Sequence, residues 1–231
     1  MCDGGPSDSE LEWRTKPEYT IDENENLTPV PPEPDIGLLD ICVARIIDVT
    51  PHPRHYETFY IQTLDTGRYS RKRKAISLFG QDYKPSELLG RLVLTVLNVR
   101  PLHSRDLVKR FLLMCAQHRR TGRVELLDPP LGSVEGDAVF VEGFRREPLD
   151  EISLGKYERK STKHYFLPYK KWNDTFHCED FDETKSMFDS TASELWVSKE
   201  KVAEFMGLPL QVEGKGVVTS RTLKNCPVVF E

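Results

Sequence analysis

A succession of short β-rich runs, interrupted by only one helical turn, is the feature that most constrains the fold of this sequence. The runs lie between Leu38 and Ala116 and are separated by turn residues such as Pro51-His52-Pro53 and Thr66-Gly67. Short runs of this kind, rich in β-branched and aromatic residues, indicate antiparallel strands. We expect strands at 38–49, 56–64, 75–77, 91–98 and 111–116, with a helical turn at 85–90. The order β-β-β-α-β-β over roughly 80 residues predicts a mainly β protein with a five-stranded OB-fold barrel, which commonly binds oligonucleotides.

The first of these strands has the alternation of a half-buried strand. One parity carries Leu39, Ile41, Val43, Ile47 and Val49. Arg45 interrupts this apolar parity, so we expect a β-bulge or an outward twist there.

Further elements are expected after the barrel. Residues 124–127 and 136–141 read as two short strands around a proline turn, and residues 211–231 as two more around Gly214-Lys215-Gly216. Between them, the pattern over 193–205 predicts a helix with Ser198 as its N-cap. The result is a small α+β region that follows the barrel.

The composition excludes several classes of protein. The 231 residues hold no apolar run of about 18, so no membrane-spanning helix and no membrane partner are expected. The five cysteines lie at least 40 positions apart, which is neither a disulfide framework nor a CxxC metal site and indicates a reducing compartment. No nucleophile motif, phosphate-binding loop or metal-ligand spacing is present. We therefore expect no catalytic residue, no metal and no cofactor: the chain is predicted not to be an enzyme.

The charge is distributed unevenly along the chain. Residues 1–35 hold two basic and ten acidic residues, whereas residues 36–125 hold 16 basic and eight acidic ones, and the whole chain has a net charge of −5. A basic segment of net charge +8 inside an acidic chain is the electrostatic pattern expected of a nucleic-acid contact. Residues 1–35 are also poor in apolar side chains and end in a proline-rich stretch, so they predict an acidic, disordered tail.

Motifs spread over most of the sequence carry a family resemblance. They are Leu39-Asp40-Ile41-x-Val43, His52-Pro53, Asn98-Val99-Arg100-Pro101, Leu113-Met114-Cys115-Ala116, the stretch from Val124 to Phe140, and the stretch from Gly207 to Val217. Together they resemble the EMAP-II-like tRNA-binding domain family, over roughly residues 37–231.

The resemblance implies an organisation and a function. It places an OB-fold tRNA-binding-like domain at 36–144 and an EMAP-II-like C-terminal domain at 145–231 that packs on the barrel. Because that added domain takes the place of a second subunit, a monomer is implied. The implied function is a non-catalytic RNA-binding module of protein biosynthesis, which binds tRNA or another structured RNA. The implied partners are aminoacyl-tRNA synthetases or another protein complex, in the cytoplasm, with a nuclear location left open.

The candidate RNA-binding residues lie at the third strand and before the fifth. They are Arg68, Arg71, Lys72, Arg73, Lys74, Tyr83, Arg100, Arg105, Lys109 and Arg110. Arg and Lys neutralise phosphates and make affinity fall with salt, and a tyrosine ring can stack on a base. A solvated hairpin and a nuclear-import signal remain alternatives for the run at 68–74. A third basic group, Arg119, Arg120 and Arg123, is expected to be a solvated turn.

A second hypothesis rests on departures from the family pattern. Where the family has a Met-Arg-Gly step and then a Ser-x-Gly-Met step, this chain reads Ser104-Arg105-Asp106 and Lys109-Arg110-Phe111-Leu112. The alternative is a pseudo-tRNA-binding domain that keeps the fold, has lost its RNA face and serves as a protein-interaction subunit of a larger complex.

Overall fold

The computed structural model describes residues 19–21, 27–29, 33–53, 58–67, 73–77, 79–80, 82–103, 108–152 and 183–231. The chain divides into two units: Met1–Pro34 with Ser153–Thr191, and Asp35–Ile152 with Ala192–Glu231. The first unit contains the antiparallel pair β1 (Tyr19–Ile21) and β2 (Leu27–Pro29) and most of helix α4 (Glu183–Ser193). Thr20, Ile21 and Thr28 in these strands favour extended backbone. The disordered tail expected over residues 1–35 stays a prediction.

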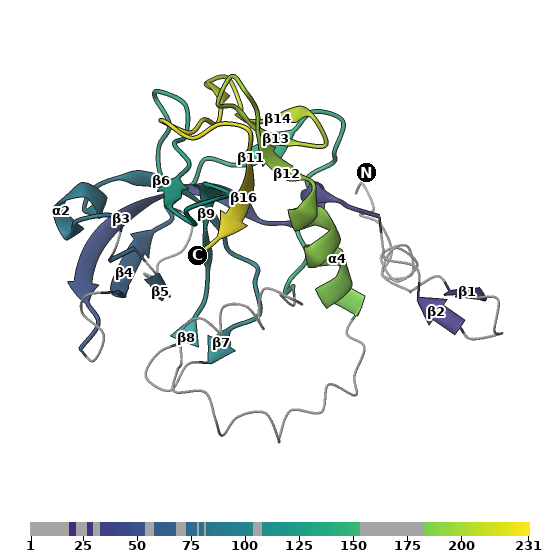
Figure 1. Cartoon of the computed structure of the whole chain (residues 1–231), viewed down its shortest axis with the longest axis horizontal. Helices are drawn as coiled ribbons and strands as arrows, with labels where there is room; N and C mark the ends of the chain where they lie inside the picture. Colours follow the sequence, from purple (N-terminus) through teal and green to yellow (C-terminus); the bar gives the residue numbers. More distant parts are fainter. Residues whose placement is uncertain are drawn as a thin grey trace, which may run out of the picture. The chain divides into compact units, whose positions relative to one another are not determined.

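The second unit is built on five antiparallel strands. They are β3 (Ile41–Pro51), β4 (Tyr60–Asp65), β5 (Arg73–Ser77), β6 (Leu92–Val96) and β9 (Leu112–Gln117). They lie in the order β9-β6-β3-β4-β5, and the one-turn helix α2 (Pro85–Leu88) connects β5 to β6. The predicted order β-β-β-α-β-β is confirmed, with only the strand ends shifted. Figure 1 shows these strands side by side.

The alternation predicted for the first strand assigns the wrong set of alternate side chains to the barrel core. Cys42, Ala44 and Ile46 belong to the barrel core, while Ile41 and Val43 are buried on the opposite face. On that opposite face Ile41 shares a small cavity with Ile36, Val139 and Leu210. Residues 136–138 hydrogen-bond to the edge of β3, as the Val43 N–H does to the Asp137 carbonyl at 2.9 Å. The bulge lies not at Arg45 but between Ile46 and Asp48, where the register to β4 shifts.

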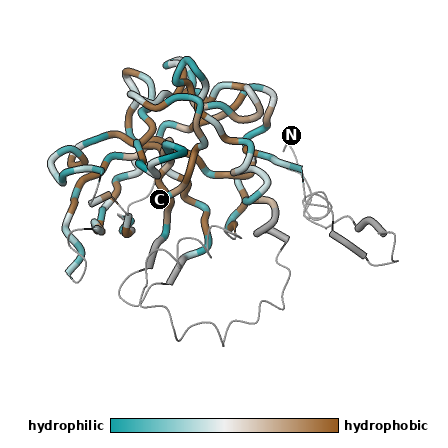
Figure 2. Tube along the Cα trace, viewed as in Figure 1, coloured by the Kyte–Doolittle hydropathy of each residue, from teal (hydrophilic) through white to brown (hydrophobic). Residues whose placement is uncertain are grey.

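The C-terminal strands extend the same sheet. They are β10 (Val124–Leu126), β11 (Val139–Val141), β12 (Leu195–Val197), β13 (Ala203–Phe205), β14 (Leu208–Val212), β15 (Gly216–Val217) and β16 (Cys226–Phe230). β16 pairs with β9 on one side and with β12 on the other, so the sheet runs from the barrel into the C-terminal strands. Figure 1 shows β16 in yellow beside the teal β9, and Figure 2 shows β16 as hydrophobic. The expected domain boundary at 144 and 145 stays a prediction, and this sheet crosses it.

The helix predicted over 193–205 is wrong. The segment contains the end of α4 and then the hairpin of β12 and β13, in which Trp196 lies opposite Glu204. Leu195 and Val197 are buried while Trp196 is half-buried, which is the period of a strand. Ser198 does not cap a helix: its hydroxyl accepts from the Val202 N–H at 3.2 Å, inside the hairpin turn. Within the described ranges no helix is long and apolar enough to cross a membrane.

The remaining short elements of the second unit precede β3 and β9 in the chain. η1 (Ile36–Leu38) precedes β3, and β7 (Leu102–His103) and β8 (Val108–Lys109) form a small pair before β9. Asn98 joins the end of η1 and the residues before β3 to Leu149. Its side chain donates to the carbonyls of Leu38 at 2.9 Å and Leu149 at 2.8 Å, and accepts from the Asp40 N–H at 2.8 Å. The asparagine of the Asn98-Val99-Arg100-Pro101 motif thus organises the residues around it.

Candidate nucleic-acid interface

The guanidinium of Arg73 connects two ends of the barrel sheet. Its Nη1 donates to the carbonyl oxygen of Leu97 at 2.7 Å and to that of Arg110 at 3.1 Å. Leu97 directly follows β6 and Arg110 precedes β9, so the start of β5 lies beside both. The start of the third barrel strand and the residues before the fifth therefore lie together at Arg73. We call Arg73, Lys74 and Arg110, together with Arg100, which follows Leu97 by three positions, the β5 edge.

The other members of the β5 edge are exposed. Lys74 and Arg110 are exposed, whereas Arg73 is half-buried. Arg100 is exposed but forms an ion pair with Glu151, Nε to Oε1 at 3.1 Å. Two of the four cations thus make contacts within the protein, and Lys74 and Arg110 present their charge to solvent. Of the other candidates, Arg68, Arg71, Lys72 and Arg105 lie outside the described residues, and of Lys109 the structure describes the backbone, in β8.

Tyr83 lies away from the β5 edge and has structural contacts. Its hydroxyl oxygen accepts from the Leu126 N–H at 2.8 Å, its ring meets Phe79 edge-on at 5.5 Å between centroids, and the Arg91 guanidinium carbon lies 5.5 Å from its ring centre. Burial raises the pKa of Tyr83 above its ordinary 10.0, and the bond from Leu126 opposes the rise. The Tyr60 hydroxyl donates to the Tyr83 carbonyl, and Tyr60 pairs with Ser77 at the far end of β5 from Arg73.

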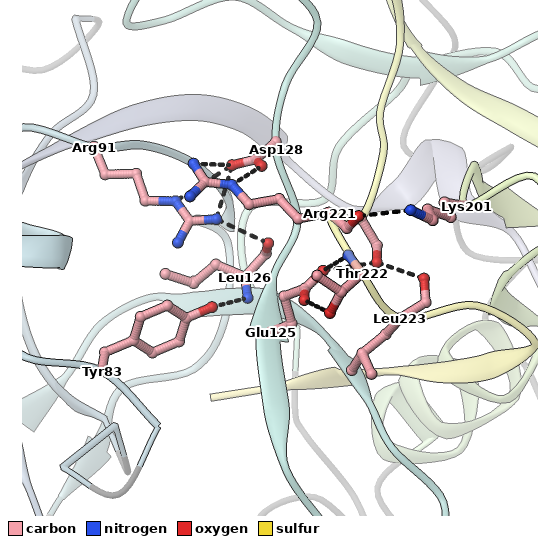
Figure 3. A network of polar contacts seen from close by, with 10 residues as sticks. Tyr83, Arg91, Glu125, Leu126, Asp128, Lys201, Arg221, Thr222 and Leu223 are labelled. Atoms are coloured by element: carbon pink, nitrogen blue, oxygen red, sulfur yellow. Dashed lines mark hydrogen bonds and ion pairs between the residues drawn. The ribbon is translucent and has the colours of Figure 1, made fainter.

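A polar network joins β10 to the segment before β16 (Figure 3). Asp128 accepts from Arg91 at 2.8 Å and from Arg221 at 2.6 Å, and Glu125 accepts from Ser220 and from the Thr222 N–H, both at 2.8 Å. Burial raises the pKa of Glu125, but the hydrogen bonds from Thr222, Ser220 and Arg221 together outweigh it and hold the pKa below its ordinary 4.5. These carboxylates are acceptors in a structural joint, a role that the sequence analysis missed. Arg91 lies 37 positions from Asp128 and the other partners more than 90 positions from their carboxylates, so no local pattern reveals them.

The arrangement offers no grouping suited to metal chemistry. In the part of the chain that the structure describes, no cluster of three or more His, Cys, Asp or Glu side chains is placed to hold a metal ion. His52 is buried and meets Phe59 edge-on at 6.3 Å between centroids. The exposed cations of the β5 edge are suited to bind an anion.

Comparison with known proteins identifies similar sequences. No protein-family model matches the chain. The chain is 27% identical over 191 residues to aminoacyl tRNA synthase complex-interacting multifunctional protein 1 of Cricetulus griseus, which covers 83% of this chain and 44% of that protein. It is 34% identical over 128 residues to the cytoplasmic tyrosine–tRNA ligase of Xenopus tropicalis, covering 54% of this chain and 24% of that protein. The chain therefore spans less than half the length of these curated relatives.

A solved structure shares the fold. The C-terminal domain of Plasmodium vivax p43 superposes with a TM-score of 0.65 at 20% identity, over 84% of this chain and 99% of that one. The mainly β class with an OB-fold barrel is thereby confirmed. The resemblance to the EMAP-II-like tRNA-binding domain family, noted from the motifs, is confirmed by these relatives.

Proposed function

Because the relatives of this chain are synthetase-associated proteins, we propose that it is a non-catalytic RNA-binding module whose ligand is tRNA. The β5 edge carries this proposal: Lys74 and Arg110 are exposed at the place where Arg73 ties β5 to the residue before β9. This edge belongs to the segment of net charge +8. Exposed cations held at fixed positions on a rigid sheet bind phosphates without reading sequence.

The wider role follows from the same relatives. The chain acts in protein biosynthesis as a cofactor or adaptor of aminoacyl-tRNA synthetases, as a monomer, in the cytoplasm. Its own chemistry is binding alone: tRNA occupies the β5 edge, and a synthetase or a synthetase complex is the protein partner. Arg68, Arg71, Lys72, Arg105 and Lys109 neighbour this edge in sequence and belong to the same proposed interface.

Filter binding of a labelled tRNA transcript at several salt concentrations tests the proposal. The double variant Lys74→Gln/Arg110→Gln should weaken binding and reduce the log–log salt slope by roughly 1.4 to 1.8, since each lost phosphate contact removes about 0.7 to 0.9. The control Lys84→Gln/Arg145→Gln removes the same charge from two other exposed positions and should leave the slope unchanged. Equal effects of the two variants would show that only overall charge matters and would overturn the assignment of the site.

The second candidate is the pseudo-tRNA-binding adaptor. The observation in its favour is that Arg73 donates to backbone carbonyls and Arg100 pairs with Glu151, so two cations of the edge are engaged within the protein. A chain that fails to bind tRNA even at low salt, yet co-purifies with synthetases from its native cytosol, supports this adaptor.

A further inference from the structure

The turn between β9 and β10 holds its backbone in one conformation. The His118 N–H donates to the Arg123 carbonyl at 2.8 Å, and the Gly122 N–H donates to the His118 carbonyl at 2.9 Å. Thr121 completes the turn: its N–H donates to the His118 Nδ1 at 3.2 Å, and its hydroxyl accepts from the Arg123 N–H at 3.3 Å. The side chains that leave this turn start from fixed positions.

Three arginines project from this turn. Arg119, Arg120 and Arg123 are all exposed. Among the described residues, no ion pair involves these three, in contrast to Arg100 at the β5 edge. Two acidic groups belong to neighbouring segments: Asp82 accepts from the Val124 N–H at 3.4 Å, and Glu204 lies opposite Trp196 in the β12–β13 ladder.

Arg119 is additionally oriented by a tryptophan. Its guanidinium carbon lies 4.5 Å from the ring centre of Trp196, which is half-buried on β12. A guanidinium stacked on an indole keeps its N–H donors in its own plane and free of the ring, so stacking fixes the group without using its donors. A planar, oriented guanidinium matches the two oxygens of a phosphate.

The turn and Arg110 of the β5 edge lie at opposite ends of β9. Arg110 precedes β9 and Arg119 follows it, nine positions later. Between them β9 has six residues, so at about 3.3 Å per residue the ends of the strand lie about 20 Å apart. A single small anion cannot bridge this distance, whereas the backbone of a structured RNA can.

From these contacts we propose that Arg119, Arg120 and Arg123, with Trp196 beneath Arg119, form a second phosphate-binding surface for a structured RNA. The inference rests on the proposed function, and it deepens it: the RNA contacts the protein at both ends of β9. The turn expected from sequence to be merely solvated is thus assigned to the interface. The surface reads backbone phosphates, so it discriminates folded RNA from single strands by shape and not by sequence.

The test uses the full chain with a tRNA transcript as probe. Arg120→Gln/Arg123→Gln leaves the Arg119–Trp196 contact and the turn backbone in place. It should weaken binding about tenfold and lower the salt slope by roughly 1.4 to 1.8. Arg120→Lys/Arg123→Lys keeps the charge and should retain most of the slope, with a smaller loss of affinity because bidentate contacts are gone. Glu204→Gln should strengthen binding, and Arg145→Gln, another exposed arginine of the same unit, should have no effect.

The outcomes separate this inference from the proposed function. If the β5 edge variant weakens tRNA binding while Arg120→Gln/Arg123→Gln does not, the second surface is refuted and the proposed function stands. If the unaltered chain binds no tRNA at low salt, both fail. If the substitutions at the turn abolish binding of a polyglutamate peptide and leave tRNA binding intact, the surface serves an acidic protein, and the proposal is wrong.

Discussion

Glu125 and Thr222, which are 97 positions apart in the sequence, are joined by two hydrogen bonds. The Thr222 N–H donates to Oε1 of Glu125 at 2.8 Å, and the Thr222 hydroxyl donates to Oε2. Ser220 adds a third bond to the same carboxylate, and Glu125 is only 4% exposed. One buried carboxylate therefore fastens the segment before β16 to β10 of the barrel.

Glu125→Gln should destabilise the protein and change its pH dependence. The amide places an NH₂ group where a carboxylate oxygen accepts, so we expect a loss of about 1 to 3 kcal/mol near neutral pH. The pKa of Glu125 is lowered from 4.5 in the folded state, so its contribution is fully present above that value and is lost as the pH falls through the folded pKa. Urea unfolding of both proteins between pH 7 and pH 3 checks this: the difference between them should shrink on acidification. A constant difference would contradict the role of the ionised carboxylate.

Tyr83→Phe separates a structural role from base stacking. The substitution removes the acceptor of the Leu126 N–H, and leaving that group unpaired should cost about 1 to 3 kcal/mol of the free energy of unfolding. The affinity for tRNA should not change, and it should also be unchanged in Tyr83→Leu at a temperature where circular dichroism shows that variant folded. A large loss of tRNA affinity in the folded Leu variant would return Tyr83 to the RNA interface.

Gly67→Ala should be far more damaging than Gly122→Ala. Both glycines have positive φ, 65° and 72°, which disfavours any side chain. At Gly67 an added Cβ would also lie 2.4 Å from the Glu135 carbonyl oxygen, whereas at Gly122 it meets nothing within 4 Å. We expect a loss of about 1 kcal/mol for Gly122→Ala and at least about 2 to 3 kcal/mol for Gly67→Ala, measured by thermal unfolding. Similar losses at the two positions would show that the loop around Glu135 yields easily.

Arg73→Ala and Lys74→Ala should differ in stability. Arg73→Ala removes the donor to two carbonyl oxygens, which should cost about 1 to 3 kcal/mol. Lys74 is exposed, and its truncation should change the free energy of unfolding by less than about 0.5 kcal/mol. Chemical denaturation of the two variants checks the difference. If Arg73→Ala is as stable as the parent, the Arg73 guanidinium does not stabilise the fold, and a role in phosphate binding would be favoured instead.

Residues 145–231 should not fold as an isolated fragment. β16 pairs with β9, and its Val229 packs against the barrel core, so the fragment lacks the strand that completes its sheet. An exposed strand edge with hydrophobic side chains is also prone to aggregation. Circular dichroism and sedimentation of the fragment are the measurements, with residues 36–231, which retain β9, as the control that should fold. A monomeric and cooperatively melting fragment 145–231 would show that the C-terminal strands form an independent domain.

The amino-acid sequence by itself determined the barrel strands. Alternation, β-branched side chains and the flanking Pro and Gly residues are local properties, and they placed β3, β4, β5, β6 and β9 in the correct order. The motif around Asn98 could also be recognised in the sequence, although its three hydrogen bonds to the backbone could not be predicted. The excess of basic residues over 36–125 likewise indicated a binding face without showing which cations remain exposed.

Only the tertiary structure decided the contacts made across long separations. The inward parity of β3 depended on distant residues such as Val139 and Leu210, which share a cavity with Ile41 on the other face. The hairpin at 195–205 formed where the local pattern favoured a helix, because β16 offers β12 a partner strand. The roles of Arg73 and Arg119 depended on carbonyls and an indole ring brought close by folding. Secondary-structure propensity depends on a few neighbouring residues, whereas burial and strand pairing depend on segments that are distant in the sequence. These features therefore could not be predicted from local sequence patterns.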